Sequence, residues 1–301
     1  MIKDYAFSEF QKKLATTGSS FRVGRFVVNL RSNITSVAKG VYQLYGESDT
    51  LNQPCDFSIQ LKSSSGIRRI IKPQVHFLFN GIEPFSSLPL SQAFPLFEWG
   101  ANWCVTNHFH ECLVIHAAVV EKDGFALILP GQPGSGKSTL CAALVEMGGW
   151  RLLSDELTMV NLNGNEILPN PRPISLKNQS IDIAKTFSNK EHFTPVVNDT
   201  LKGSVAHLKA PLQSVLDFDK SALPGAIVYP KYMRGVGTSL QKISKGTSFI
   251  KLAEHSFNYS VLGEQGFQTL SHLHDQVECY EYCYDGSLPD AIKLMGSLLP
   301  S

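Results

Sequence analysis

The sequence predicts an α/β fold, with a smaller, mainly β amino-terminal lobe over residues 1–90 and a larger domain over residues 91–301. Apolar, strand-like runs alternate with helix-like segments from about residue 109 onward, which is the pattern of a layered α/β core. One of these runs leads into a glycine-rich loop that is followed directly by a helical pattern. Residues 1–90 instead show short alternating runs between turn-rich pieces, which is typical of β structure.

The amino-terminal lobe is predicted from four short runs. Residues 21–30 and 75–79 alternate between apolar and polar side chains as strands do, and residues 41–45 and 57–61 are shorter runs. Turn-rich pieces such as residues 46–50 separate them. No motif in this lobe indicates a chemistry.

The larger domain is predicted to begin with a helix over residues 91–108. Its further elements follow from apolar runs bounded by glycine, proline and polar residues. The expected strands are 113–120, 124–130, 157–162, 225–230 and 279–284, and the expected helices are 139–147 and 288–299.

The composition limits the classes of protein to be considered. A net charge of +1, from 27 basic and 26 acidic residues without a long block of one sign, argues against nonspecific binding to nucleic acid or anionic membranes. The first residues lack the apolar core of a signal peptide, and the longest apolar runs are too short to span a bilayer. We therefore expect a soluble, cytoplasmic protein with neither nucleic acid nor a membrane as a partner.

The loop after residues 124–130 carries the motif that points most directly to a chemistry. It matches G-x-x-x-x-G-K-[ST] at every required position. In such a loop backbone N–H groups point at phosphate oxygens, the lysine (Lys137) reaches the β- and γ-phosphates, and the hydroxyl (Ser138) ligates Mg²⁺. The predicted nucleotide-binding residues are Gly131, Gln132, Pro133, Gly134, Ser135, Gly136, Lys137, Ser138 and Thr139.

An acidic pair, Asp155 and Glu156, directly follows the apolar residues Leu152 and Leu153. A phosphate loop needs a second acidic site for the metal and a group that deprotonates the acceptor, and adjacent carboxylates can divide these two tasks. We therefore predict that Asp155 and Glu156, together with Ser138, contact Mg²⁺. The alternative is a solvated turn or a helix cap.

His116 interrupts the otherwise apolar run 113–120, one strand before the loop. A polar ring in such a strand costs free energy unless it is hydrogen-bonded. It is therefore either a functional residue of the neighbouring site or a histidine whose hydrogen bonds are satisfied in the core.

Together, His116, the glycine loop and residues 151–156 resemble the catalytic domain of the HPr kinase/phosphorylase family. The sequence is more similar still to the HPr-kinase-related group of A type, in which four short motifs recur. These are His-Ala-Ala, Gly-Lys-Ser-Thr-Leu, Leu-Ser-Asp-Glu and Pro-x-Pro-Arg-Pro, at residues 116–118, 136–140, 153–156 and 169–173 of this sequence.

This resemblance implies the phosphoenolpyruvate-carboxykinase-like variant of the phosphate-loop fold. It also implies that Asp155 and Glu156 share acceptor deprotonation and metal contacts, without showing which does which, and that His116 is functional. Relatives of the A type accompany a small PqqD-like peptide-binding protein, and the parent enzyme is a homo-oligomer. The parent family's Glu-x-Arg-Gly-Leu-Gly segment was not found after the acidic pair, where residues 168–177 stand, which argues against phosphorolysis.

Four further cations are candidates for phosphate contacts. Arg172 and Lys177 lie in and after the proline-rich segment, and Lys231 and Arg234 follow the predicted strand 225–230. Each could stabilise the charge of a transferred phosphoryl group. The alternatives are a structural arginine between prolines and two solvated surface cations.

The sequence and the resemblance favour an ATP-dependent kinase that transfers the γ-phosphoryl group to a Ser or Thr hydroxyl of a small protein or peptide. Its catalytic residues would be Lys137, His116 and the acidic pair, with ATP and Mg²⁺ bound at the loop. Two alternatives stay open. One is a kinase of a small hydroxylated metabolite such as free serine, and the other is a nucleotide-binding regulator without turnover.

Overall fold

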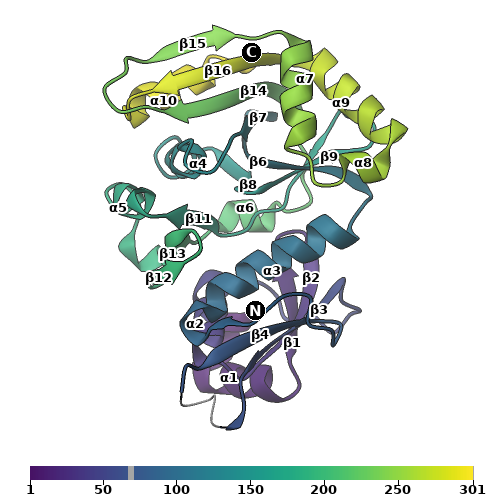
Figure 1. Ribbon diagram of the computed structural model, residues 1–301, viewed down its shortest axis with the longest axis vertical. Coiled ribbons are helices and arrows are strands. Elements are labelled where there is room, and N and C mark those ends of the chain that lie inside the picture. The colour runs from purple at the N-terminus through teal and green to yellow at the C-terminus, as the bar shows by residue number, and fades with distance from the viewer. Residues whose placement is uncertain (67–70, 301) are drawn as a thin grey trace. The chain divides into compact units, whose positions relative to one another are not determined.

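The computed structural model describes residues 1–66 and 71–300, and it is a mixed α/β protein (Figure 1). The chain divides into two compact units. One comprises Met1–Val105 and Lys190–Lys209, and the other comprises Thr106–Asn189 and Ala210–Ser301. In the described part of the chain, no helix combines the length and apolar character that a bilayer crossing requires.

The first unit contains a five-stranded sheet in the order β1-β2-β3-β4-β5. Strands β2 and β3 are parallel, because helix α2 connects them, and the other neighbours are antiparallel. The strands are β1 (Ser19–Val23), β2 (Phe26–Ser32), β3 (Phe57–Ser63), β4 (Gln74–Phe79) and β5 (Leu88–Pro89). The helices are η1 (Ile2–Asp4), α1 (Phe7–Thr16), α2 (Thr35–Leu44), η3 (Leu90–Gln92), η4 (Lys190–His192) and, up to Val105, α3 (Ala93–His108).

The expectation of a strand-like run at residues 41–45 is wrong, because this segment ends helix α2. The buried residues Val37, Ala38, Val41 and Leu44 follow the helical period. The first two lie before residue 41, where the strand-like run was expected to begin. Helices α1, α2 and α3 make this unit α/β rather than mainly β.

The division into units also differs from the expected boundary at residue 90. Most of α3 groups with the first unit, and so does the later segment Lys190–Lys209. This segment carries β12 (Val197–Thr200) and β13 (Gly203–Leu208). Side chains of the first unit hold it, since the Gln43 amide donates to the Phe193 carbonyl at 2.9 Å.

The second unit is built on an eight-stranded sheet in the order β10-β9-β6-β7-β14-β16-β15, with β8 also paired to β6. Strands β7, β14 and β16 are parallel, whereas β6 and β15 are antiparallel to their neighbours. The strands are β6 (Cys112–Lys122), β7 (Phe125–Pro130), β8 (Arg151–Ser154), β9 (Leu157–Asn161), β10 (Ile167–Leu168), β14 (Leu223–Tyr232), β15 (Ser239–Lys242) and β16 (Glu278–Tyr284).

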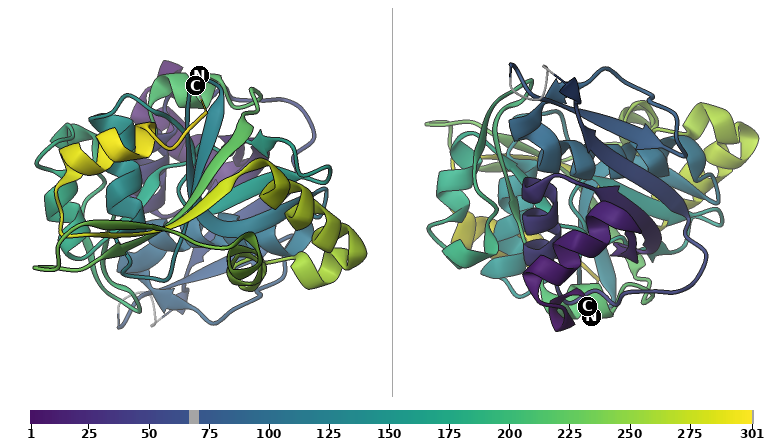
Figure 2. Two further views of the ribbon diagram at one scale, coloured as in Figure 1. Left: turned by 90° about the horizontal axis from the view of Figure 1, so that it is seen from above. Right: turned by 90° about the horizontal axis from the view of Figure 1, so that it is seen from below.

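The two faces of this sheet are covered by different helices (Figure 2, left). Alternate β6 residues from Leu113 to Val119 pack into an apolar core with residues of α7 and α9. The opposite face carries α4 and α10. The helices of this unit are α4 (Lys137–Glu146), α5 (Gln179–Ala184), α6 (Leu212–Leu216), α7 (Lys245–Glu254), α8 (Tyr259–Leu262), α9 (Glu264–Gln276) and α10 (Leu288–Gly296), and strand β11 (Ile174–Lys177) lies outside the sheet.

The elements predicted around the glycine loop are confirmed. Strands β6, β7, β9, β14 and β16 and helices α3, α4 and α10 lie where the sequence places them, with ends that differ by a few residues. Helices α7, α8 and α9, which cover one whole face of the sheet, were not predicted.

Candidate functional site

The glycine loop connects the end of β7 to the start of α4. Gly134 and Gly136 both have a φ of 87°, a left-handed conformation that side-chain-bearing residues rarely adopt. Between them, the Ser135 N–H donates to the Gln132 carbonyl at 3.1 Å. The two glycines are therefore required by the shape of the loop itself.

The carbonyl groups of the loop are held by two tyrosine residues of the sheet. The Tyr232 N–H donates to the Ser135 carbonyl at 2.9 Å, and the Tyr284 hydroxyl donates to the Gly136 carbonyl at 3.1 Å. A Cβ atom on Gly136 would lie 2.3 Å from that hydroxyl oxygen, so a side chain does not fit there. Because β14 and β16 run parallel to β7, the carboxyl ends of three strands meet at the loop.

Four backbone N–H groups at the tip of the loop and the start of α4 have no acceptor in the described part of the chain. Within the described residues, the N–H groups of Gly134, Gly136, Lys137 and Ser138 donate no hydrogen bond. Free N–H groups in the first turn of a helix carry partial positive charge. This end of α4 is therefore suited to bind an anion.

Lys137, the first residue of α4, is 8% exposed, so its ammonium group is almost entirely removed from water. Among the described residues, no acceptor lies within hydrogen-bonding distance of it. Burial lowers the pKa of Lys137, and the negative charges of Asp155 and Glu156 oppose that shift. The lysine is thus held near two carboxylates without being neutralised by direct contact.

Asp155, which follows β8, is 3% exposed and has unequal carboxylate oxygens. Its Oδ2 accepts the Ser175 N–H at 2.9 Å and lies 3.4 Å from the Ser138 hydroxyl. Its Oδ1 is buried and has no hydrogen-bond partner among the described residues. Burial first, and then the charge of Glu156, raise the pKa of Asp155 from 3.8 to about 6.

Glu156 and Lys177 form the more open part of the site. The Lys177 ammonium lies 3.4 Å from the Glu156 carboxylate, and their side chains are 30% and 23% exposed. Strand β11 carries both Ser175, which binds Asp155, and Lys177. One strand therefore positions both members of the acidic pair.

His116 lies on β6 beside the site. It pairs with Leu157 in the sheet, and its neighbour Ala117 pairs with Pro130, the last residue before the loop. Because Ala117 packs into the core on the α7–α9 side, alternation places the His116 side chain on the α4 face. The imidazole stacks on Phe257, with ring centroids 5.6 Å apart and an interplanar angle of 14°.

The remaining predicted cations fall into two environments. Arg172 is buried. Its segment runs beside β8, as shown by the hydrogen bond that the Asn170 N–H donates to the Leu153 carbonyl at 2.8 Å. Lys231 and Arg234 are exposed on either side of Tyr232, which binds the loop. Neither of these two forms an ion pair within the described part of the chain.

Three contacts of the site were not predicted, namely those of Ser175, Tyr232 and Tyr284. Ser175 acts through its backbone N–H, so its side chain gives no signal in the sequence. The tyrosines stand at the carboxyl ends of β14 and β16, where ligand sites of parallel sheets form. Their positions after predicted strands could have drawn attention to them.

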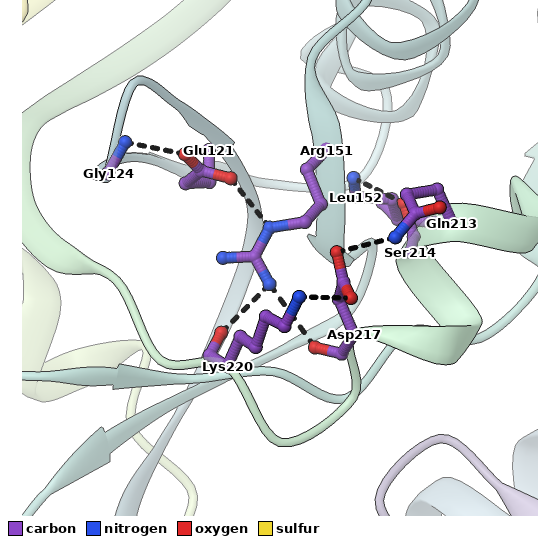
Figure 3. A network of polar contacts seen from close by, with 8 residues as sticks. All are labelled: Glu121, Gly124, Arg151, Leu152, Gln213, Ser214, Asp217 and Lys220. Atoms are coloured by element: carbon purple, nitrogen blue, oxygen red, sulfur yellow. Dashed lines mark hydrogen bonds and ion pairs between the residues drawn. The ribbon is translucent and has the colours of Figure 1, made fainter.

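Arg151, at the start of β8, belongs to a separate polar network (Figure 3). Its Nε donates to Glu121 at 2.6 Å, and its Nη1 donates to the carbonyls of Asp217 and Lys220 at 3.2 and 2.8 Å. Glu121 in turn accepts the Gly124 N–H at 2.6 Å. This network ties β8 to the β6–β7 turn and to the loop after α6.

The site residues fit a nucleotide phosphate group and a magnesium ion. The free N–H groups and Lys137 match the charge of a polyphosphate, and the unpartnered Oδ1 of Asp155 is a hard oxygen ligand. Ser138 Oγ and Asp155 Oδ2 are 3.4 Å apart, and two oxygens on one Mg²⁺ can be at most about 4.2 Å apart. One cation can therefore bind both residues.

Comparison of the sequence with models of known protein families finds no match, and comparison with curated proteins finds none either.

Proposed function

We propose that this protein is an ATP-dependent kinase of the HPr-kinase-like type, with the phosphoenolpyruvate-carboxykinase-like fold, acting on a Ser or Thr hydroxyl of a small protein or peptide. The observation that carries the proposal is a pair of buried, incompletely partnered charges, Lys137 and Asp155, beside a loop of free N–H groups. Unpaired buried charges cost several kcal/mol. A bound polyphosphate and its cation would supply the missing partners of both.

In this proposal the loop residues Gly131–Thr139 hold the triphosphate of ATP. The N–H groups of Gly134, Gly136 and Ser138 would bind phosphate oxygens, and Lys137 would balance charge that develops on the β- and γ-phosphates. Lys231 and Arg234 are exposed and lie close in sequence to Tyr232, which binds the loop. Their positive charges would add to that of Lys137 at the phosphates.

Ser138 and Asp155 would hold Mg²⁺, because their oxygens are 3.4 Å apart and Asp155 keeps a free oxygen. The cation would neutralise phosphate charge when bound. A phosphate-loop hydroxyl and an aspartate on a neighbouring strand are a recurring magnesium ligand pair.

Glu156 would then be the general base. It is more exposed than Asp155, and Lys177 orients its carboxylate at 3.4 Å. The acceptor hydroxyl would lose its proton to Glu156 while its oxygen bonds to the γ-phosphorus and the bond to the bridging oxygen of ADP breaks. His116, on the same face of the sheet, would orient the acidic pair or contact phosphate.

The choice of a protein or peptide as the acceptor rests on the resemblance to the HPr-kinase-related group of A type. The residues that carry this resemblance are 116–118, 136–140, 153–156 and 169–173. A PqqD-like peptide-binding protein would present the acceptor, the enzyme would work in the cytoplasm, and a homo-oligomer would be consistent with the parent family. Free serine is the competing acceptor, and a regulator without turnover is the competing function.

The test incubates the whole protein with labelled ATP, Mg²⁺ and either candidate peptides or free hydroxy amino acids, and follows the acceptors by intact mass. One added phosphate on a peptide, absent with Lys137→Ala, is the expected result. Transfer to free serine alone would show that the acceptor is a small metabolite and not a protein or peptide. Tight ATP binding without any transfer would support a nucleotide-binding regulator without turnover.

A second experiment separates the two carboxylates. Asp155→Asn should weaken Mg²⁺-dependent ATP binding, whereas Glu156→Gln should leave ATP binding within about twofold and lower kcat by about 10²- to 10⁴-fold. The reverse pattern would exchange the two assigned roles.

A further inference from the structure

Tyr232 presents an exposed aromatic ring directly beside the phosphate loop. It ends β14, and its N–H binds the Ser135 carbonyl at 2.9 Å. Because Tyr229 packs into the core on the α7–α9 side, alternation puts Tyr232 on the face of α4 and the loop. Tyr232 is 39% exposed, whereas Tyr282 and Tyr284 on the neighbouring strand are 1% and 2% exposed.

The position of this ring is fixed by its neighbours. Tyr232 meets Tyr284 edge-on, with ring centroids 5.7 Å apart and an interplanar angle of 64°. Tyr284 is itself stacked on Tyr282 at 5.3 Å and 4°. An ordered ring that stays open to solvent can bind a flat ligand at a low cost in conformational entropy.

Two glycines border the ring and keep it accessible. A Cβ atom on Gly136 would lie 3.0 Å from the Tyr232 Cβ, and one on Gly286 would lie 3.4 Å from its Cε2. Both glycines have positive φ, 87° and 114°. Side chains are thus absent on both sides of an aromatic surface that adjoins the anion-binding end of α4.

We propose that Tyr232 is the platform on which the base of the phosphate donor stacks, so that the donor is a nucleoside triphosphate rather than an inorganic polyphosphate. This inference rests on the proposed function of the loop. A polyphosphate bound by the loop amides gains nothing from an aromatic partner, whereas a base attached to it gains free energy by stacking on one. Aromatic rings stack on every base, so this contact favours nucleotides as a class.

The backbone and the side chain of Tyr232 can be tested separately. Its N–H supports the loop in every variant except proline, so replacing the side chain leaves that hydrogen bond in place. A loss of affinity that follows removal of the side chain is therefore due to the ring and not to the backbone hydrogen bond.

The experiment measures, by calorimetry with Mg²⁺, the Kd of the full chain for ATP and for tripolyphosphate. Tyr232→Ala should raise the Kd for ATP about tenfold and change that for tripolyphosphate by less than twofold. Tyr232→Phe should behave like the wild type. Tyr280→Ala, on the same face of β16 but paired to Val228 far from the loop, is the matched control and should change neither.

Each other outcome overturns the inference in a distinguishable way. If Tyr232→Ala weakens the binding of ATP and of tripolyphosphate equally, the ring supports the loop. If it changes neither affinity, the base binds elsewhere. A wild-type protein that binds tripolyphosphate but not ATP would reject the base platform and keep the phosphate site. Binding of neither ligand would reject the proposed function as well.

A spectroscopic measurement gives a second, independent readout. In Tyr232→Trp the new indole should be quenched by ATP but not by tripolyphosphate, relative to the same titrations of the wild type. Quenching by both ligands, or by neither, would contradict stacking of the base at this position.

Discussion

The two ends of strand β8 carry charged side chains in opposite states. At its start, Arg151 donates to Glu121 and to the carbonyls of Asp217 and Lys220, with Glu121 also held by a backbone N–H. Just beyond its end, Asp155 keeps a buried oxygen without a partner among the described residues. Lys137, close enough to influence it electrostatically, forms no direct ion pair there either.

The difference is the one expected between a structural polar network and the proposed binding site. Folding removes both sets of charges from water, which costs several kcal/mol per ion unless partners replace the water. The Arg151 network contains its own partners (Figure 3). The Asp155 site has partners for Oδ2 alone among the described residues, which supports the proposal that a ligand binds there. Three predictions test this contrast, and a fourth separates support of the loop from stacking of a base.

Lys137→Ala should produce the largest effect, a loss of phosphoryl transfer of about a thousandfold or more. Because the buried ammonium has no partner to lose within the described residues and its burial costs free energy, the variant should be at least as stable as the wild type. Assays of transfer and urea unfolding of the same variant check both parts. Lys39→Ala, on the exposed side of α2, serves as the control. A large loss of stability would make Lys137 a structural residue.

Arg151→Ala should behave in the opposite way. It leaves Glu121, 13% exposed at its side chain, and two backbone carbonyls without their partner. We expect the free energy of unfolding to fall by about 3 kcal/mol, with ATP binding of the folded protein unchanged.

The control is the double variant Arg151→Met/Glu121→Leu, in which an apolar pair replaces the ion pair and should recover most of the loss. Urea unfolding of the three proteins gives the comparison. An Arg151→Ala variant as stable as the wild type but unable to bind ATP would place Arg151 in the site.

Asp155→Asn should stabilise the protein at neutral pH. The folded pKa of about 6 lies above 3.8, so the native state binds the proton more tightly than the unfolded state does. Well below pH 3.8 the group is neutral in both states and contributes nothing. As pH rises from about 4 to 6 stability is lost, and above pH 6 the full cost of about 3 kcal/mol is present.

The measurement compares urea unfolding of the wild type and Asp155→Asn at pH 4 and pH 7. The variant should be more stable by about 2 to 3 kcal/mol at pH 7, should lie within about 0.5 kcal/mol of the wild type at pH 4, and should lose Mg²⁺-dependent binding. Asp182→Asn, exposed on α5, is the control substitution. A destabilised variant at pH 7 would mean that the ionised carboxylate has a partner in the folded protein.

The parts of the site that the sequence predicts are those formed by neighbouring segments. The strand, loop and helix at residues 125–146 form one local unit, and β8 returns beside β6, so Ser138 and Asp155 come together over a short stretch of chain. Tyr232 and Tyr284 arrive from strands about 100 and 150 residues away, and only the parallel pairing of β7, β14 and β16 brings them to the loop.

The fold was predicted less well where apolar patterns are short or interrupted. In α2 the apolar face begins at Val37, before the run that resembled a strand. Helices α7 and α9 are amphipathic, and their exposed apolar residues Ile250 and Phe267 blur the helical period. The assignment of Lys190–Lys209 to the first unit depends on long-range hydrogen bonds such as Gln43 to Phe193, which leave no local pattern.

Tyr284→Phe should give the smallest effect and should separate support of the loop from stacking of a base. The variant keeps the ring and loses the hydrogen bond to the Gly136 carbonyl, worth about 1 kcal/mol. Burial raises the pKa of Tyr284, so its hydroxyl stays protonated and donates throughout the working range. Since the loop itself is loosened, ATP and tripolyphosphate should both bind about fivefold more weakly.

The control for this variant is Tyr282→Phe, which removes a hydroxyl from the ring stacked on Tyr284 and should change neither affinity. Calorimetry with both ligands on both variants provides the measurement. A loss confined to ATP would mean that Tyr284 acts on the base, as we propose for Tyr232. Equal losses for the two ligands, set against the selective loss in Tyr232→Ala, would assign one tyrosine to the loop and the other to the base.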